Sequence, residues 1–107
     1  MVIEMFPAEN GDAFLIRLEN EKNIMVDMGY GETYKRFIKD RLINLKSKNQ
    51  CIDLLIITHI DEDHIEGAIE FFKDNGYADN PNIIEVKEIW YNSYRHLQFS
   101  KEKVSQI

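Results

Sequence analysis

The feature that most constrains the fold is a short apolar run, Ile52–Thr58, in which Leu and Ile residues occupy both faces of an extended chain. Such a run is far too short to span a bilayer. It is typical of a central strand that is covered on both sides of its sheet. With 107 residues, the chain has room for one small domain built around that strand.

The residue pattern on either side of this run predicts an α/β arrangement. Alternating and β-prone segments predict strands, and apolar residues at helical spacing predict helices. The expected strands are Val2–Phe6, Asp12–Leu18, Asn23–Asp27, Ile52–Thr58 and Ile83–Tyr91. The expected helices are Glu32–Asn49, with an apolar stripe of Tyr34, Phe37, Ile38, Leu42 and Leu45, and His64–Asn75, with Ile65, Ala68, Ile69 and Phe72, before a capping Gly76. The first three strands form an antiparallel meander, and Ser93–Ile107 is expected to be a loop or weak helix.

Charge and cysteine content bear on the binding partners and the cellular compartment that we expect for the protein. The chain has 19 acidic and 13 basic residues, a net charge of −6, which does not favour a general nucleic-acid binder. The basic residues of the first helix are interpreted as a solvated face, with a phosphate-attracting surface as the alternative. Cys51 cannot form an internal disulfide, and we expect a buried spectator thiol in a cytoplasmic protein. No secretory signal or membrane segment is predicted.

The segment His59-Ile60-Asp61-Glu62-Asp63-His64 is the part of the sequence that indicates chemistry. It joins the buried strand to a helix, so its side chains can converge on one point. Two imidazoles and two carboxylates form a mixed ligand set that suits Zn²⁺, Mn²⁺ or Fe²⁺ better than Ca²⁺. An EF-hand is a poor alternative, because its glycine and later glutamate are missing. A solvated acidic turn with two incidental histidines is the other alternative.

Together with Thr58, this segment resembles the signature loop of the metallo-β-lactamase superfamily, His-x-His-x-Asp-His, with Asp61 in place of the second histidine. That variant is similar to the hydrolase domain of bacterial competence (DNA-uptake) proteins. Other segments resemble the family as well, over about residues 1–95: Gly11–Ile16, Met25–Gly29 and His64–Ala68, where Glu66 takes the first position of a small-residue pair.

The resemblance implies a fold and a set of site residues. The fold would be a mixed sheet with two helices on one face, half of a four-layer αββα sandwich, so that residues 1–107 form one partial, N-terminal domain. Two divalent ions, Zn²⁺ in the first place and Mn²⁺ in the second, would be held by His59 and Asp61 and by Asp63 and His64. Asp63 would also orient a metal-bound hydroxide as the catalytic carboxylate. Asp27 would orient the loop, and Asn92 and His96 are candidates for the rim of the site, although His96 is more readily interpreted as a solvated or structural histidine.

The expected function is a metal-dependent hydrolase that acts on phosphodiesters, including nucleic acid, with its remaining ligands beyond this chain. The isolated chain would then be incomplete as an enzyme. Hydrolysis of a lactam, thioester or lactone is the alternative within the enzyme class, and a truncated, non-catalytic half-domain that serves assembly is the alternative outside it. Because two helices cover only one side of the sheet, we expect self-association or pairing with the missing C-terminal half, and no membrane partner.

Overall fold

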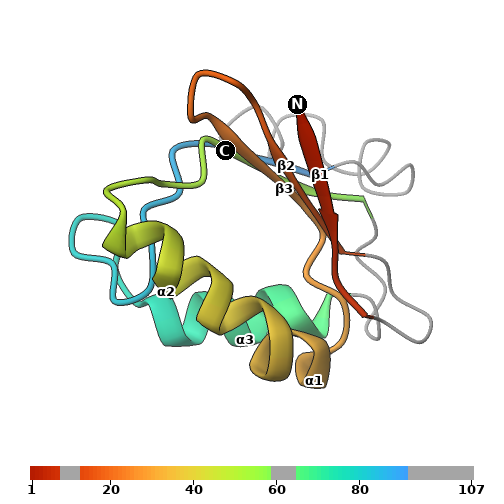
Figure 1. Cartoon of the computed structure of the whole chain (residues 1–107). Coiled ribbons are helices and arrows are strands. Elements are labelled where there is room, and N and C mark those ends of the chain that lie inside the picture. The colour runs from red at the N-terminus through yellow and green to blue at the C-terminus, as the bar shows by residue number, and fades with distance from the viewer. Residues whose placement is uncertain (8–12, 59–64, 92–107) are drawn as a thin grey trace.

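The computed structural model describes residues 1–7, 13–58 and 65–91, and these form a sheet of five strands with helices packed on one of its faces (Figure 1). The strands follow one another across the sheet in chain order. They are β1 (Val2–Met5), β2 (Phe14–Arg17), β3 (Asn23–Val26), β4 (Leu54–Ile57) and β5 (Ile89–Tyr91). The helices are α1 (Gly31–Thr33), the π-helical turn η1 (Tyr34–Ile38), α2 (Lys39–Ser47) and α3 (Glu66–Asn75).

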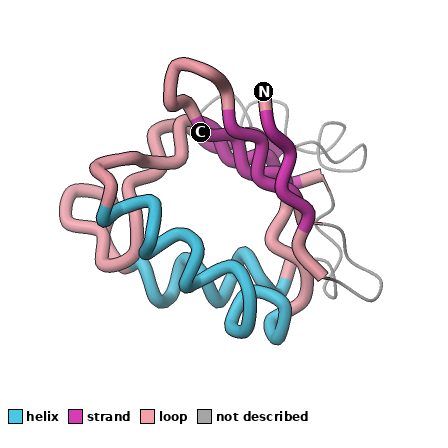
Figure 2. The backbone as a smooth tube through the Cα atoms, in the orientation of Figure 1, coloured by secondary structure: helices cyan, strands magenta, loops and turns pink. Residues whose placement is uncertain are grey.

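The sheet is mixed, and its topology explains the position of the helices. β1, β2 and β3 pair antiparallel as the predicted meander, whereas β3, β4 and β5 pair parallel. Parallel neighbours need crossover connections, which are usually helical. The segment α1–η1–α2 connects β3 to β4, α3 lies between β4 and β5, and both lie on the same side of the sheet (Figure 2). The predicted α/β class, with two helical segments on one face, is confirmed.

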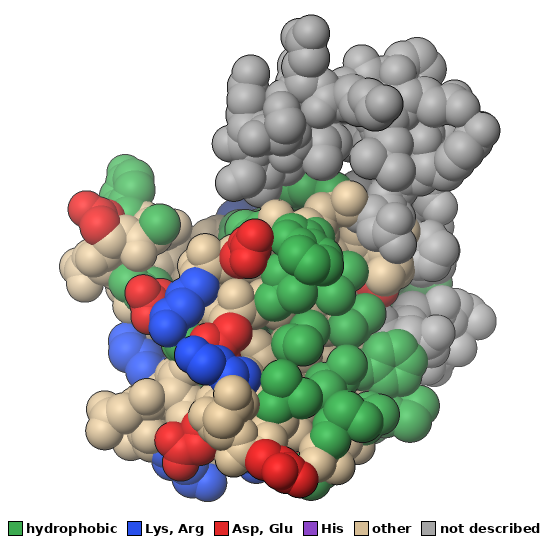
Figure 3. Space-filling view, turned by 90° about the horizontal axis from the view of Figure 1, so that it is seen from above, with side chains coloured by type: hydrophobic (Ala, Val, Ile, Leu, Met, Phe, Trp, Pro, Cys, Tyr) green, Lys and Arg blue, Asp and Glu red, His purple; other side chains and the backbone are tan. Residues whose placement is uncertain are grey.

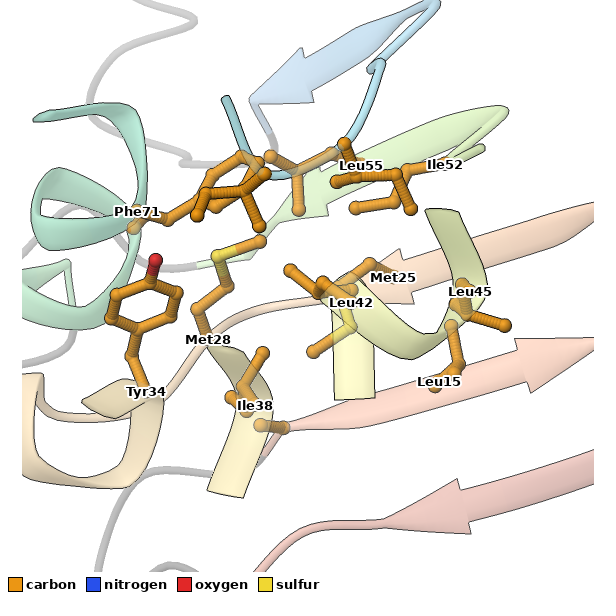
Figure 4. Close-up of a cluster of buried hydrophobic side chains, with 14 of the residues drawn as sticks. Leu15, Met25, Met28, Tyr34, Ile38, Leu42, Leu45, Ile52, Leu55 and Phe71 are labelled. Carbon is orange, nitrogen blue, oxygen red and sulfur yellow. The ribbon is translucent and has the colours of Figure 1, made fainter. Parts of the chain in front are cut away.

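The core of the described residues lies between the sheet and the helices (Figure 4). The strands β2, β3 and β4 contribute alternate side chains to this core, and Leu15, Met25 and Leu55 are completely buried. The helical segments cover them with fully buried side chains at helical spacing: Tyr34, Ile38, Leu42, Leu45 and Phe71. The spacing of the first four is the apolar stripe that the sequence predicts.

Phe37 is a correction to that stripe, because it is 41% exposed. It lies within η1, where the backbone follows a π-helical instead of an α-helical turn. A π-helical turn contains more residues than an α-helical turn, so a side chain three positions after Tyr34 is rotated away from the buried side. Ile38, at the next position, takes the buried place instead.

The apolar face predicted for α3 also needs correction. Ile69 is 42% exposed, whereas Phe71 is completely buried beside Ala68. The side of α3 that faces the core includes Gly67, whose lack of a side chain lets the helix approach the backbone near Met28. Gly67 influences which side of α3 faces the core. The spacing of apolar residues alone does not predict this influence.

The strands are shorter than predicted, most clearly the last one. Ile83 and Ile84 are buried, but their amide N–H groups donate to Oδ1 of Asn75, at the end of α3, at 2.9 Å. Ile83 and Ile84 are therefore bonded to the end of α3 and are not part of a strand. Ile52 and Val86 form only an isolated parallel bridge. Gly76 ends α3 with a φ of 73°, as its predicted capping position requires.

The predicted Ser93–Ile107 segment lies outside the described residues, as does the start of the predicted Asp12–Leu18 strand. In the described ranges, no helix combines the length and the apolar character that crossing a lipid bilayer requires.

Candidate metal centre

The ligand-rich motif, His59 to His64, lies outside the described residues, and so do the two rim candidates Asn92 and His96. What the structure describes is the pair of flanks from which the motif extends. One flank is Thr58, which directly follows β4, and the other is the start of α3 at Glu66. Both flanks are held by the short connection between β3 and α1.

The first flank is fixed by the side chain of Asp27. The backbone N–H of Thr58 donates to Oδ1 of Asp27 at 2.8 Å, and the hydroxyl of Thr58 donates to the other carboxylate oxygen, Oδ2. Both carboxylate oxygens of Asp27, a residue that is only 8% exposed, therefore accept hydrogen bonds from Thr58. The residue that precedes His59 in the chain is consequently tied to the end of β3.

Asp27 also has the backbone conformation that this contact needs. Its φ is 59°, in the left-handed region that most side chains avoid and that Asp and Asn tolerate. Its own N–H donates to the carbonyl oxygen of Ile56 at 2.8 Å, so the backbone bonding between β3 and β4 continues up to the turn. A plain turn former would use its side chain locally, whereas this one reaches the neighbouring parallel strand.

The second flank is fixed by backbone contact at Gly67. Its N–H donates to the carbonyl oxygen of Gly29 at 2.9 Å. A Cβ atom added at Gly67 would lie 2.1 Å from the carbonyl oxygen of Met28 and 2.6 Å from that of Gly29. Only glycine allows α3 to begin this close to the β3–α1 connection.

Asp27, Met28 and Gly29 therefore hold both flanks of the motif, and we call these three residues the anchor turn. The side chain of Asp27 holds Thr58, and the carbonyl of Gly29 holds Gly67. The described residues on either side of the motif are thus held to one turn. The sequence indicated Asp27 as an orienting residue, but it did not reveal the contact at Gly67. The signal in the sequence was a glycine inside a predicted helix. Glycine there destabilises a helix by about 1 kcal/mol relative to alanine, so its presence indicates a packing requirement.

A hollow of about 300 Å³ lies where α3 begins, between α3 and the α1–η1 segment, and it is lined by Gly31, Glu32, Lys35, Glu66, Ile69 and Glu70. Its polar groups already interact with one another. The N–H of Gly31 points to Oε1 of Glu66 at 3.5 Å, and the ammonium of Lys35 lies 4.0 Å from Oε2 of Glu70. These contacts link Gly31 of α1 and Lys35 of η1 to side chains of α3.

Several basic residues of the first helical segment are paired with acidic or carbonyl groups. Arg41 forms a two-pronged pair with Glu4 of β1, with both N–O distances 2.8 Å, and this hydrogen bond holds the pKa of Glu4 below its usual range. Lys39 lies 3.3 Å from Asp74, while Lys46 donates to the carbonyl of Pro81. These pairs fit the interpretation as a structural and solvated face better than that of a phosphate-binding surface.

Cys51 has the environment of a spectator thiol. It is partly buried, and this burial raises the pKa of the thiol, which disfavours the reactive thiolate. Its thiol donates to Oδ1 of Asp53 at 3.7 Å, and the negative charge of that carboxylate disfavours the thiolate further.

The chemistry of the donor set decides whether the motif fits a metal. In the described ranges, no group of three or more His, Cys, Asp or Glu side chains could hold an ion, and each carboxylate oxygen of Asp27 accepts a hydrogen bond from Thr58. The motif itself supplies the imidazoles of His59 and His64 and, among its carboxylates, those of Asp61 and Asp63, all suitable for a divalent transition metal. The residues present therefore fit such an ion, with the motif as donors and Asp27 as a support.

The family model of the metallo-beta-lactamase superfamily matches residues 7–102 of this chain. That range includes β2 to β5, both flanks and the motif, so the chain belongs to the metallo-β-lactamase superfamily. The mixed sheet with helices on one face is consistent with part of that fold. The superfamily is mainly hydrolytic and generally binds divalent metals. No curated protein matches the sequence.

Proposed function

We propose that the chain carries the first metal-binding segment of a metal-dependent hydrolase that cleaves phosphodiesters, nucleic acid among them. The observation that supports the proposal most directly is the anchor turn, which holds both flanks of the motif through Asp27 and Gly29. A merely solvated acidic turn has no need of two such attachments. Superfamily membership supports the hydrolytic class.

In this proposal each motif residue has one role. His59 and Asp61 would hold one divalent ion, and Asp63 and His64 would hold a second. When bound, the ions lower the pKa of a shared water and stabilise negative charge on the attacked centre. Asp63 would also orient that nucleophile, and Asp27 would keep the residue before His59 in place. Zn²⁺ is proposed first, and Mn²⁺ is proposed second because Asp61 is a harder, anionic ligand than histidine and shifts the preference toward Mn²⁺.

The choice of a phosphodiester depends on the similarity of the His-x-Asp-x-Asp-His variant to the competence-type hydrolases. The basic helical face adds little to it, since Lys35, Lys39 and Arg41 pair with Glu70, Asp74 and Glu4. We further propose that the remaining metal ligands come from outside the chain, because a dinuclear site with open positions needs about three protein ligands more than the motif supplies. Cys51 fits a reducing, cytoplasmic setting for such an enzyme.

The test is a substrate panel with Zn²⁺ or Mn²⁺, measured on the 107-residue chain and on the chain extended by any residues encoded after Ile107. The panel contains bis-p-nitrophenyl phosphate, single-stranded DNA, a β-lactam, a thioester and a lactone. We expect metal-dependent turnover of the first two by the extended protein and little by the 107-residue chain. Asp63→Ala should lower kcat by several orders of magnitude, because the nucleophile is no longer oriented.

Turnover of the lactam, thioester or lactone alone would replace the phosphodiester by that substrate class. Absence of turnover in every preparation, with metal bound, would favour the non-catalytic half-domain that serves assembly.

A further inference from the structure

Three polar pairs join α3 to the helical segment before it, and the two members of each pair are 35 positions apart in the sequence. The pairs are Asp74 with Lys39, Glu70 with Lys35, and Glu66 with Gly31. Successive members are four positions apart on both segments, so they follow one side of each helix. We call these three pairs the charge ladder. It runs along the contact between α3 and the α1–η1 segment, which lie side by side (Figure 1).

The charge ladder lacks a cation at its third pair. In the first two pairs, the ammonium of a lysine lies 3.3 Å and 4.0 Å from a carboxylate oxygen. In the third pair, Glu66 faces a glycine, and the backbone N–H of Gly31 lies 3.5 Å from Oε1 of Glu66. Across the described ranges, no lysine or arginine forms an ion pair with Glu66.

The hollow between α3 and the α1–η1 segment lies at this third pair. Both Gly31 and Glu66 line its volume of about 300 Å³. A Cβ atom added at Gly31 would lie 4.0 Å from Oε1 of Glu66 and 3.7 Å from Cγ of Glu70, which is ordinary contact distance. The hollow therefore occupies the space into which a longer side chain at position 31 would extend.

The lining of the hollow suits a cation on an aliphatic stem. The carboxylates of Glu32, Glu66 and Glu70 line it together with a single ammonium, that of Lys35, so the formal charge of the lining is −2. Ile69, which is 42% exposed, adds an apolar wall. Long basic groups pack their carbon stem on such a wall and keep the charged head with acids or water. An anion such as phosphate would be repelled there.

The side of the sheet away from the helices is a poorer environment for such a group. Figure 3 shows apolar side chains gathered over the sheet on that side, with Lys, Arg, Asp and Glu toward the edge. An ammonium or guanidinium placed among apolar side chains loses contact with water and gains no carboxylate. The hollow offers it several carboxylates and an apolar wall at the same time.

We propose that the hollow binds an aliphatic cation, an ammonium or guanidinium group on a short carbon stem. The cation takes the vacant place in the charge ladder, with its head between the carboxylates of Glu66 and Glu70 and its stem against Ile69. Hydrogen bonds between charged groups of this kind are the stronger ones. The lysine or arginine side chain of a partner protein and a small polyamine share this chemistry.

The experiment is an NMR titration of the 107-residue chain, free of divalent metal, with butylguanidinium. Butylurea, which has nearly the same shape and no charge, is the control ligand. We expect the amide signals of Gly31, Lys35 and Glu66 to move, with a Kd on the order of 1 mM at low salt and no saturable change with butylurea. Raising the salt from about 10 mM to about 150 mM shortens the Debye length from about 30 Å to about 8 Å and should weaken binding several-fold.

Two further ligands distinguish the sources of the cation. N-acetylarginine amide represents the side chain of a partner protein, and 1,4-diaminobutane represents a polyamine. Both should move the same amide signals, and the ligand with the lower Kd identifies the source.

Gly31→Lys supplies the missing cation from the chain itself, and Gly31→Gln is its uncharged control. A cation in the first turn of a helix is ordinarily unfavourable, so helix electrostatics alone predicts the lower melting temperature for Gly31→Lys. The charge ladder predicts the opposite order, with Gly31→Lys melting about 2–4 °C above Gly31→Gln. The affinity of Gly31→Lys for butylguanidinium should fall at least tenfold, because its own ammonium occupies the hollow.

Glu66→Gln and Glu85→Gln each remove one negative charge. Glu66 lines the hollow, whereas Glu85 is exposed and is not part of its lining. The first should weaken the binding of butylguanidinium at least fivefold, and the second less than twofold. Circular dichroism checks that both variants are folded.

Signals that butylurea moves equally, or binding that Gly31→Lys and Glu66→Gln leave unchanged, would overturn the proposal. So would a melting temperature of Gly31→Lys below that of Gly31→Gln, or signal changes centred on residues 59–64, which would mean that the cation binds the acidic motif instead. Because the proposal requires no metal and no turnover, none of these results bears on the proposed hydrolase.

Discussion

The two flanks of the ligand-rich motif are held to the same turn by opposite means. At Thr58, the contact is made by a side chain, because the carboxylate of Asp27 reaches the end of the neighbouring strand and accepts two hydrogen bonds. At Gly67, the contact depends on the absence of a side chain, because the helix backbone lies directly against the carbonyls of Met28 and Gly29. A side-chain contact can be weakened in steps by substitution, whereas a backbone contact is lost when any side chain is added.

This comparison predicts that the Gly67 flank is the more sensitive of the two. Gly67→Ala places a methyl group 2.1 Å from the Met28 carbonyl oxygen, and backbone atoms cannot move away as a flexible side chain can. We expect the free energy of unfolding to fall by about 3 kcal/mol, at the upper end of overpacking effects. Urea denaturation followed by circular dichroism measures it.

Gly31→Ala is the matched control for that variant. A Cβ at Gly31 meets nothing closer than 3.7 Å, the Cγ of Glu70. Its expected effect on the free energy of unfolding is about 0.5 kcal/mol or less. Equal effects of the two alanines would show that the close approach at Gly67 is unimportant.

At the other flank, Asp27→Ala should cost about 2 kcal/mol. The N–H of Thr58 loses its acceptor, which costs about 1–3 kcal/mol for a group that water reaches poorly, and alanine is strained at a φ of 59°. Metal affinity should fall by about 10–100-fold, as it does when a residue that supports metal ligands is removed. Isothermal titration with Zn²⁺ and a urea series measure the two effects on the same protein.

Asp27→Asn separates the contribution of the negative charge at this position from those of the backbone conformation and the hydrogen-bond acceptor. Asparagine tolerates the left-handed conformation and keeps an acceptor for the Thr58 N–H, so most of the stability should return. If Asp27→Ala left both stability and metal affinity unchanged, the anchor turn would have no role in positioning the motif.

The smallest effect is expected from Thr58→Val, which removes only the hydroxyl contact to Oδ2 of Asp27. A single hydrogen bond of this kind contributes about 1 kcal/mol or somewhat more when its partner is charged. The backbone contact from Thr58 remains, so metal affinity should fall less than for Asp27→Ala. Thr58→Ser, which retains the hydroxyl, should be close to the unmodified protein, and a loss as large as that of Thr58→Val would point to packing of the methyl group instead.

The sequence predicted what depends on local pattern. The alternation in β2 and the apolar run of β4 defined strands, and the spacing of Tyr34, Ile38, Leu42 and Leu45 defined the buried side of the first helical segment. Phe37 was assigned wrongly because the period of a helix changes at a π-helical turn, and sequence spacing does not reveal that change.

The contacts that hold the motif depend on tertiary structure, and the sequence could indicate them only in part. Asp27 and Thr58 are 31 positions apart, and their contact follows from the parallel pairing of β3 with β4. Gly67 and Gly29 meet because α3 begins beside the turn that follows β3, which no local pattern encodes. The ligand roles of His59, Asp61, Asp63 and His64 remain predictions, as do the rim positions Asn92 and His96.

Whether the His59–His64 motif binds a divalent metal is tested most directly by a metal titration with Zn²⁺ and with Mn²⁺. The titration compares the 107-residue chain with His59→Ala/His64→Ala. His96→Ala serves as the control that removes an imidazole outside the motif. We predict that the unmodified chain binds the metal, that the double variant loses at least about 100-fold in affinity, and that His96→Ala stays within about threefold. Equal or negligible binding by the unmodified chain and the double variant would contradict the account.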